Sequence, residues 1–373
     1  MAPLSTADVI VTIRRMNDGK AVLSAFGAGR SLVQVQTQTR RVEDAGFQTL
    51  WLPEGSQPVF ATCTAAALAA PSLTLGTSVA VAFARSPMLT AQAAWMLAEA
   101  TEGRFVIGLG TQVRAHIERR FSAEFTHPGP RLREYIEAMR AIYTAFRGDA
   151  KLDYRGDYYS FSLLTPMWSP GPLAYPDPPI YVAGVREWMC QMVGEAADGL
   201  LVHPLNTIAY LDNTVLPAVR RGEAAAGRNP GTVAFVCPVM TAVSDDGAVR
   251  ERQRDAIRAR LAFYGSTPGY GVVFDASGWP GIGERLNALQ RERDLDAMKA
   301  MISDEMLDAM SVTSTWDELP AKLLDRFGDR ADDIVCYSVL EHWDDDPDSL
   351  ERWQDVNRRF DELQGQGVRD ARR

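Results

Sequence analysis

The sequence predicts a single (β/α)8 barrel, and three observations point to it. Eight short β-prone runs are spread over the chain, and most are continuously apolar, as in strands buried on both faces of a parallel sheet. Helical patterns lie between these runs, and a glycine-ended turn recurs before them. A chain of 373 residues, 46% of them hydrophobic, has a length typical of an α/β barrel folded as one domain. The alternation favours a closed barrel over its main alternative, an open Rossmann-like sheet.

The strands are expected at eight places in chain order. They cover residues 22–26, 49–52, 73–81, 105–109, 180–183, 200–203, 233–243 and 334–339. Between the first two strands, apolar positions repeat with a period of 3.6 residues, and the same period follows the sixth strand, so both segments are expected to be amphipathic helices. These positions are Leu32, Val35, Thr39 and Val42 in the first helix, and Leu211, Val215 and Val219 in the second.

Three of the predicted helices end in an acidic residue followed within a few positions by a glycine. The glycines are Gly46, Gly103 and Gly199, and a predicted strand follows each at once. Glycine suits the left-handed position that ends many helices. The sequence therefore predicts the same tight αβ turn three times.

The barrel is expected to span residues 21–365, between an N-terminal extension, 1–20, and a C-terminal tail, 366–373. Two segments are expected to interrupt it. Residues 150–178 contain Arg155-Gly156-Asp157, an expected hairpin turn, and then a proline-rich stretch. Residues 263–305 carry clustered glycines and prolines before a charged helix. Both are expected to be insertions at barrel loops, where lids, binding loops and packing arms occur.

Composition excludes several classes of function. A formal charge of −9 argues against nucleic-acid binding, and no apolar run is long enough to cross a membrane. The short apolar stretch 9–13 does not resemble a secretory signal, so the cytoplasm is expected. The four cysteines are far apart and are expected to be buried free thiols, and the scattered histidines predict no metal site.

Active sites of such barrels lie at the carboxyl ends of the strands, and this rule selects the candidate residues. They are Glu54 after the second strand; Ser78 and Val79 at the end of the third; Gly110 and Thr111 at the end of the fourth; Ala183, Gly184, Val185 and Arg186 at the end of the fifth; and His203 at the end of the sixth.

Each candidate also has a purely structural interpretation. Gly108 and Gly110 lack the third glycine of a dinucleotide motif because Val113 stands there. They either let the strand turn or let backbone approach a ligand. Ala183-Gly184-Val185 forms either an anion cradle at a helix N-terminus or a tight turn.

The charged candidates leave the same choice open. Glu54 could pair with a cation, and His203 could be a satisfied rim residue rather than a proton donor. His116 lies in a segment, 104–133, that holds six arginines against two glutamates. Arginine suits phosphate and carboxylate recognition, but a helix face exposed to solvent would contain the same residue types.

Several motifs together resemble the bacterial luciferase-like superfamily, and within it the branch that uses the deazaflavin coenzyme F420. They are Leu75-Gly-Thr-Ser-Val79, Arg85-Ser-Pro87, Ala91-Gln92, Gly103-Arg-Phe-Val-Ile-Gly-Leu-Gly110, Pro179-Ile-Tyr-Val-Ala-Gly184 and Ala197-Asp198-Gly199. The resemblance covers about residues 20 to 345. It implies a (β/α)8 barrel, often a homodimer, with a non-proline cis peptide between Ser78 and Val79 behind the deazaflavin ring.

The resemblance also implies a function and a site. It implies an oxidoreductase that moves a hydride between F420 and a small organic substrate, with Glu54 and His203 as catalytic candidates. The cofactor would contact Glu54, Ser78, Val79, Gly110, Thr111, His116, Ala183, Gly184, Val185 and Arg186. The alternatives are an FMN-dependent monooxygenase of the same superfamily and a non-catalytic flavin-binding barrel.

Three departures argue against a sugar-phosphate substrate. Related sugar-phosphate dehydrogenases have a catalytic histidine after the acidic residue, where this chain has Gly55. Their glutamate after the fourth strand falls at Val113. Their phosphate-binding lysine falls near Asn206.

Overall fold

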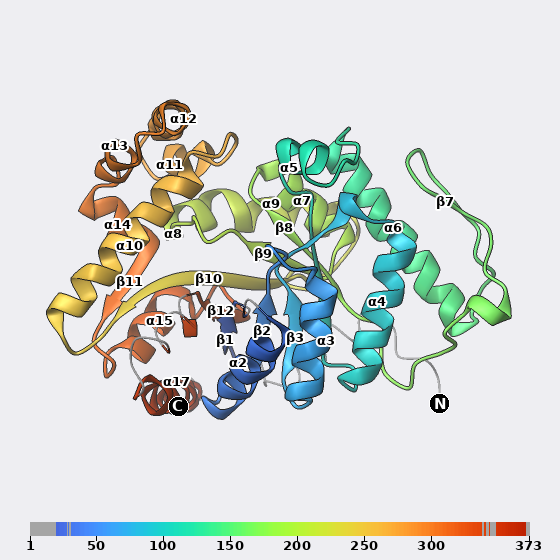
Figure 1. The fold of residues 1–373 in the computed structure, drawn as a ribbon, viewed down its shortest axis with the longest axis horizontal. Helices are drawn as coiled ribbons and strands as arrows, with labels where there is room; N and C mark the ends of the chain where they lie inside the picture. Colours follow the sequence, from blue (N-terminus) through green and yellow to red (C-terminus); the bar gives the residue numbers. More distant parts are fainter. Residues whose placement is uncertain are drawn as a thin grey trace.

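The computed structural model describes residues 20–370, except 28, 30, 338, 341, 342 and 344–347. Eight parallel strands close into a barrel surrounded by helices (Figure 1). Closure is complete because β1 pairs with both β2 and β12, while β10 joins β9 to β12. The predicted (β/α)8 barrel is therefore confirmed. Its strands are β1 Val22–Phe26, β2 Thr49–Leu52, β3 Thr74–Thr77, β5 Phe105–Gly110, β8 Ile180–Gly184, β9 Gly199–Val202, β10 Ala234–Val243 and β12 Asp333–Cys336.

The strand predictions needed three corrections. The expected strand 73–81 is divided into β3 and a short β4, Ala80–Val81, with Ser78 and Val79 between them. The expected strand 334–339 ends earlier, at Cys336. A further strand, β11 Ser311–Ser314, pairs with the outer half of β10. It was not predicted because its serines and threonines form no apolar run.

Two of the three predicted αβ turns have the expected geometry. Gly46 and Gly103 have φ angles of 83° and 84°, in the left-handed region that favours glycine. The prediction for Gly199 is wrong, since this residue begins β9 instead of capping a helix. Glycine is needed there for space, because a Cβ would lie 2.7 Å from the Tyr181 ring.

Two aromatic rings lie in the barrel interior, among the buried side chains of Val106, Leu201, Ala234, Val236 and Val335. Trp51 on β2 and Tyr181 on β8 lie with ring centroids 6.1 Å apart. Gly76 on β3 makes room for Trp51, since a Cβ at this position would collide with the indole. The indole Nε1 donates a 2.8 Å hydrogen bond to Oδ2 of Asp333, at the start of β12. The interior is therefore packed, and Asp333 places an acidic group at the end of the barrel where β12 begins.

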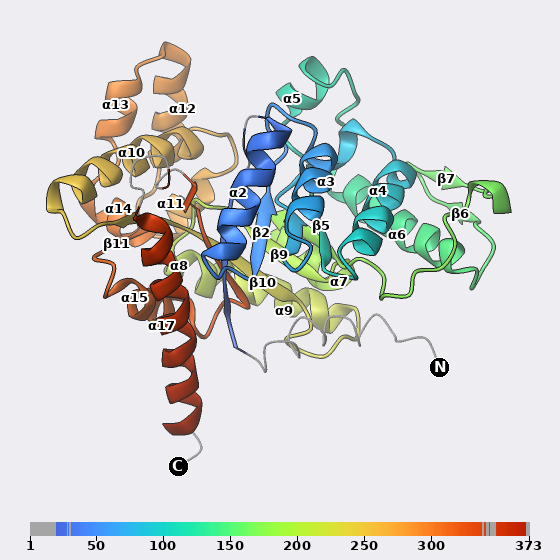
Figure 2. The same ribbon diagram turned by 60° about the horizontal axis from the view of Figure 1, so that its bottom comes forward.

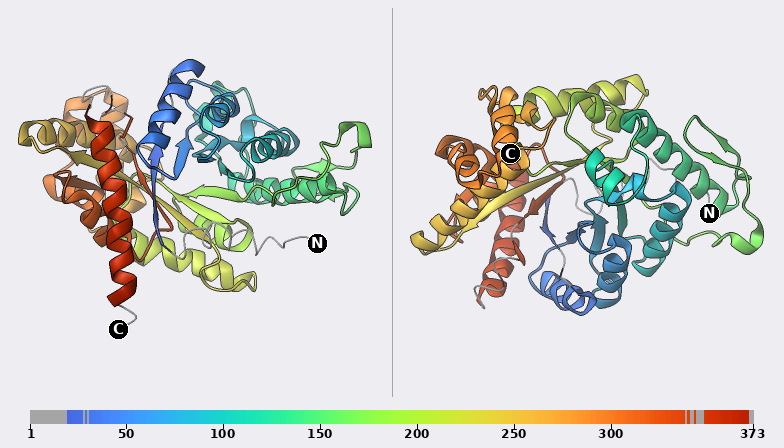
Figure 3. Two further views of the ribbon diagram at one scale, coloured as in Figure 1. Left: turned by 90° about the horizontal axis from the view of Figure 1, so that it is seen from below. Right: turned by 45° about the horizontal axis from the view of Figure 1, so that its top comes forward.

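The outer layer consists of helices that follow the strands. Val35, Thr39 and Val42 are the buried positions of the predicted first helix, α2. Helix α17 lies along the outside of the molecule and packs on α15 and α2 (Figures 2 and 3). The helices are α2 Leu32–Asp44, α3 Val59–Ala69, α4 Pro87–Ala100, α5 Arg114–Arg119, α6 Pro128–Arg147, α7 Glu187–Ala196, α8 Ile208–Tyr210, η3 Leu211–Val215, α9 Leu216–Ala225, α15 Leu319–Phe327 and α17 Ser349–Asp370, with the 3-10 turn η1 Ala82–Ala84.

The first predicted insertion is a hairpin, which projects on one side of the barrel (Figure 1). Its strands are β6 Tyr154–Arg155 and β7 Ser160–Phe161, followed by the 3-10 turn η2 Pro166–Trp168. The buried carboxylate of Glu134, on α6, accepts hydrogen bonds from the backbone N–H groups of Asp157 and Tyr158 at 2.9 and 2.8 Å. The predicted hairpin is confirmed, and this carboxylate fixes it to the barrel.

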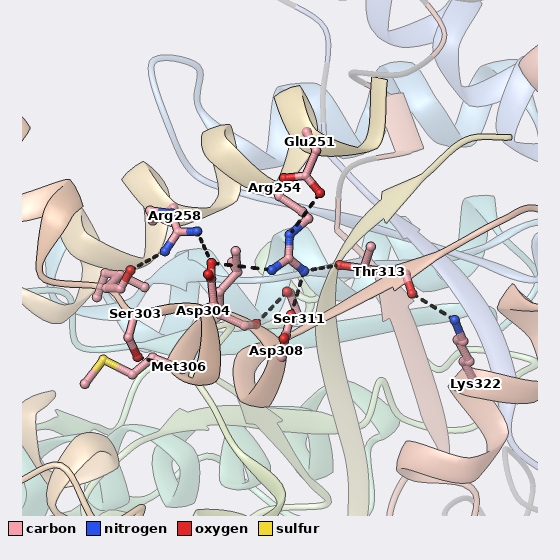
Figure 4. Close-up of polar contacts among 12 residues, drawn as sticks. Glu251, Arg254, Arg258, Ser303, Asp304, Met306, Asp308, Ser311, Thr313 and Lys322 are labelled. Atoms are coloured by element: carbon pink, nitrogen blue, oxygen red, sulfur yellow. Dashed lines mark hydrogen bonds and ion pairs between the residues drawn. The ribbon is translucent and has the colours of Figure 1, made fainter. Parts of the chain in front are cut away.

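The second insertion is a helical arm on the opposite side (Figure 1). It extends beyond the expected residues 263–305 on both sides, and several short helices follow its glycines and prolines where one charged helix was expected. A network around Arg254 joins α10 to α14 and β11 (Figure 4), with guanidinium hydrogen bonds of 2.6 Å to Asp308 and 2.7 Å to Thr313. Arg258 reaches Asp304 at 2.5 Å. The arm contains α10 Gly247–Gly265, α11 Gly271–Ala276, α12 Ile282–Glu292, α13 Leu295–Ala300 and α14 Asp304–Met310.

Three properties of the described residues bear on function. None of their helices has both the length and the apolar character needed to cross a bilayer. They contain no group of three or more His, Cys, Asp or Glu side chains placed to hold a metal ion. All four cysteines are buried free thiols, as predicted, and burial raises the pKa of Cys190 to about 12. These thiols are therefore poor nucleophiles.

Asp333 provides a test of the barrel interior. Burial raises the pKa of its carboxyl group to about 7. The folded chain therefore binds this proton more tightly than the unfolded chain, and the free energy of unfolding should fall as pH rises from about 4 to about 7. The Asp333→Asn variant has no carboxyl group here, so its free energy of unfolding should lack this decrease. At pH 8 the variant should be more stable than the wild type by up to about 4 kcal/mol. Urea unfolding of both proteins at pH 4.5 and pH 8 measures the difference. Parallel pH dependences of the two proteins would contradict it.

Candidate functional site

The barrel brings most of the predicted site residues to one end, the mouth formed by the carboxyl ends of its strands. Glu54, Ser78 and Val79 lie on the β2–β3 side, and Gly110 and Thr111 lie next to them at the end of β5. The next two strands around the barrel after β5 are β8 and β9, whose ends carry Ala183, Gly184, Val185, Arg186 and His203. His116 is on α5, beyond the end of β5, and is exposed.

The turn between β3 and β4 packs closely against β5. The Ser78–Val79 peptide bond is cis, as predicted. A Cβ at Gly110 would lie 2.6 Å from Cγ2 of Val79, and one at Gly108 would overlap the carbonyl oxygen of Thr77. The two glycines therefore serve a structural purpose, since they let the turn approach the neighbouring strand. Val79 itself packs above the barrel interior together with Phe26 and Ala183, so the floor of the mouth is apolar.

Glu54 is held in a buried ion pair. Its side chain is only 4% exposed and faces Arg85, whose side chain is 16% exposed. The Oε2 atom accepts 2.7 Å hydrogen bonds from Nη1 of Arg85 and from the backbone N–H of Val81, and Oε1 accepts from Nη2 of Arg85. Both carboxylate oxygens are thus occupied. This arrangement suits a group that positions the β4 segment better than one that exchanges protons.

The turn from β8 into α7 forms the part of the rim next to β5. Strand β8 ends at Gly184 and α7 begins at Glu187, with Arg186 as the N-cap residue and no side chain capping the helix. The N–H groups of the first helical turn are therefore left for another acceptor, and the helix dipole favours a negative one. The exposed Arg186 side chain lies against Gly269 of the arm. This rim can bind an anionic group such as a phosphate.

His203 is neutral in the folded protein. Burial lowers its pKa to about 3. Its Nδ1 accepts a 3.0 Å hydrogen bond from the backbone N–H of Leu205, which assigns the remaining ring proton to Nε2. A neutral imidazole can donate a hydrogen bond through Nε2 but is a poor source of protons at pH 7.

The predicted arginine cluster is not a single patch. Arg104 lies at the opposite end of β5 from the mouth, where it donates a 2.6 Å hydrogen bond to the Pro71 carbonyl. Arg131 and Arg133 pair with Glu124 and Glu195. Exposed guanidinium groups near the mouth are carried by α5 and its C-terminus: Arg114, bonded to Glu118, Arg120, bonded to the Gly55 carbonyl, and Arg119, which has no ion-pair partner among the described residues.

Some residues at the mouth were not predicted from the sequence. Tyr264 and Tyr270 of the arm lie against His203, with ring centroids at 5.1 and 4.4 Å. Both tyrosines belong to the predicted insertion at 263–305. The expected position of this insertion at a barrel loop was the one indication in the sequence that its residues could reach the mouth. Nothing local to these tyrosines distinguishes them from packing residues, because their partners are some 60 residues away.

Comparisons with known proteins agree with this architecture. The Luciferase-like monooxygenase family model matches residues 15–333. An uncharacterized protein of Mycobacterium tuberculosis is 40% identical over 285 residues, which are 76% of this chain and 84% of that protein. A 5,10-methylenetetrahydromethanopterin reductase of Archaeoglobus fulgidus is 27% identical over 297 residues, or 77% of this chain and 83% of the reductase.

A solved structure shares the fold. The coenzyme F420 dependent tetrahydromethanopterin reductase from Methanopyrus kandleri superposes with a TM-score of 0.73 at 18% identity. The match covers 91% of this chain and 97% of that one. At this level of identity the likeness establishes the barrel architecture.

The Glu54–Arg85 pair can be tested by a double-mutant cycle. Glu54→Gln and Arg85→Met should each lower the free energy of unfolding by about 2–4 kcal/mol, because each leaves a buried charged partner uncompensated. The double variant should lose less than the sum of the two single losses, with a coupling energy of at least about 1 kcal/mol. Urea unfolding of the four proteins measures this coupling. Strictly additive losses would show that the two side chains do not interact.

Proposed function

The chain belongs to the luciferase-like monooxygenase family, and on that basis we propose that it is an F420-dependent oxidoreductase. It transfers a hydride between the deazaflavin and a small organic substrate. The observation that carries this proposal is the uncapped N-terminus of α7, which follows β8 and lies at the rim beside the apolar floor of the mouth. That combination suits a cofactor with a planar ring and a phosphate. The relative from Methanopyrus kandleri, described as coenzyme F420 dependent, supports the deazaflavin in particular.

The residues at the mouth fit such a cofactor. Val79 and Ala183 offer an apolar surface for the ring system, and the first turn of α7, after Gly184 and Val185, offers N–H groups for the phosphate. Thr111, at the end of β5, and His116, on α5, are proposed to line the path of the cofactor tail. When bound, the deazaflavin would supply two-electron hydride chemistry.

The side chains of this protein then have distinct tasks. Glu54 keeps its place at the cofactor through its ion pair with Arg85, which fixes the β4 segment next to Val79. We assign it positioning rather than proton transfer. His203 donates a hydrogen bond from Nε2 to an electronegative atom of the substrate, because its ring is neutral and its Nδ1 is already occupied.

An FMN-dependent monooxygenase is the second candidate. The family description names a monooxygenase, and a helix N-terminus binds the single phosphate of FMN as readily as the phosphodiester of a longer cofactor. A homodimer also stays a proposal, supported by exposed apolar side chains on neighbouring helices: Leu32, Val33, Leu68 and Met96.

Cofactor titration tests the function directly. The purified protein should bind F420 at least tenfold more tightly than FMN, as measured by quenching of cofactor fluorescence at equilibrium. Tighter binding of FMN would replace the proposal by the monooxygenase. Failure to bind either cofactor would identify a non-catalytic barrel.

The guanidinium groups of α5 provide a prediction about the cofactor tail. F420 carries a polyanionic tail that FMN lacks, and Arg119 and Arg120 are exposed beside the mouth. Exposed ion pairs contribute about 0–1 kcal/mol each, so the double substitution to alanine should weaken F420 binding about three- to tenfold at low ionic strength. The difference should shrink at 0.5 M salt, because the Debye length falls from about 30 Å at 0.01 M to about 4 Å at 0.5 M. Arg155→Ala on the hairpin is the matched control. Unchanged F420 affinity in the double variant at low salt would remove these arginines from the site.

A further inference from the structure

Five rings form a continuous surface along one side of the mouth, here called the aromatic wall: Tyr270, His203, Tyr264, Tyr337 and Phe26. The His203 ring contacts Tyr270 and Tyr264, with centroids 4.4 and 5.1 Å apart. The hydroxyl groups of Tyr264 and Tyr337 are 2.7 Å apart and share a hydrogen bond. The rings of Tyr337 and Phe26 are stacked at 4.2 Å with an interplanar angle of 15°. All five side chains are partly exposed.

The wall lies on the side of the barrel away from the β3–β4 turn. His203 follows β9, Tyr337 follows β12 and Phe26 ends β1, whereas Val79 lies between β3 and β4 next to β5. A ring resting on the apolar floor at Val79 would therefore have the wall on its other side. This is the part of the mouth that remains for a second molecule once a cofactor occupies the β3–β8 side.

The arm supplies the two tyrosines that complete the wall. Tyr264 is in the last turn of α10, and Tyr270 immediately precedes α11. Helix α10 is fixed by the Arg254 hydrogen bonds to Asp308 and Thr313 (Figure 4). The position of Tyr264 thus depends on the arm and not on the barrel sequence around the mouth.

The wall offers π faces and neutral donors. His203 is uncharged, since burial lowers its pKa to about 3, and burial raises the pKa of Tyr270, which keeps that phenol protonated. The amide of Asn206 is no anion site, because it is buried and its Nδ2 donates to the carbonyls of His203 and Pro238 at 2.9 and 3.1 Å. The guanidinium of Arg260 lies 5.7 Å from the Tyr337 ring, at the end of the wall distant from Tyr270.

We propose that the aromatic wall is the substrate subsite and selects an uncharged, planar, conjugated carbonyl compound. This rests on the proposed oxidoreductase function, whose substrate class it specifies. The ring of the substrate stacks on the tyrosine and imidazole faces, and its carbonyl oxygen accepts the Nε2–H of His203. A sugar phosphate has no flat π face to stack on these rings, and the guanidinium of Arg260 lies at the end of the wall distant from Tyr270, so a sugar phosphate is disfavoured.

Equilibrium binding of defined probes tests the subsite without catalysis. The probes are 1-indanone, which is planar and conjugated, its fully saturated bicyclic ketone, which has the same carbonyl but no π face, and glucose 6-phosphate. Isothermal titration calorimetry with the F420-loaded protein should show that 1-indanone binds about three- to tenfold more tightly than the saturated ketone, the range expected for one or two aromatic contacts. Glucose 6-phosphate should bind more weakly than either ketone.

Variants of the wall identify the residues responsible. Tyr264→Leu and Tyr270→Leu should each abolish the preference for 1-indanone, while Tyr264→Phe, which keeps the ring, should retain it. Tyr154→Leu on the hairpin is the matched control and should behave as wild type. Circular dichroism shows whether each variant is folded, and the second leucine variant decides the test if the first is not.

The outcomes separate the two proposals. If F420 binds but neither leucine variant changes the preference, or if glucose 6-phosphate binds best, the subsite is overturned and the oxidoreductase function stands. If F420 does not bind, the function fails, and the same ketone titrations on the cofactor-free protein then decide whether the wall recognises planar rings by itself.

Discussion

The close approach of the β3–β4 turn to β5 is the constraint on which the rest of the mouth depends. Glycine at 108 and 110 removes the side chains that would collide with Thr77 and Val79. Thr77 then exchanges hydrogen bonds with the Gly108 backbone at 2.7 and 2.8 Å. With the turn in this place, the carbonyl of Val79 accepts the backbone N–H of Glu54 at 3.3 Å, and the Glu54 side chain reaches Val81. A larger residue at either glycine would move the whole rim.

The two sides of the mouth are built from different parts of the chain. The side at β2, β3 and β5 is made by the barrel and is locked by the buried Glu54–Arg85 pair. The other side receives Tyr264 and Tyr270 from the arm, which is fastened to β11 and α14. A barrel can thus keep one rim constant while an insertion alters the other, because loops at this face change without disturbing strand pairing.

Charge at the mouth follows from pairing more than from composition. The segment 104–133 is rich in arginine, but most of these side chains are bonded to carboxylates or backbone carbonyls. Arg104 is even at the other end of the barrel, because a six-residue strand, β5, separates it from the mouth. Pairing also neutralises a negative charge at the mouth. The carboxylate of Glu54 is compensated by Arg85, a partner that the sequence alone does not identify.

The sequence by itself determined the barrel, the order of its strands and the end at which the site lies. These features depend on short-range signals: continuous apolar runs, helical periodicity, and glycines such as Gly46 and Gly103 whose backbone conformation favours that residue. The family resemblance of the motif around Ser78 and Val79 also indicated the cis peptide at the end of β3, whereas the apolar run 73–81 predicted one continuous strand. Only the tertiary structure decided which partners those residues meet. Arg85 is 31 positions from Glu54, and Tyr337 is 73 from Tyr264. Such contacts are fixed by barrel closure and by the packing of the arm, and no local pattern in the chain encodes them.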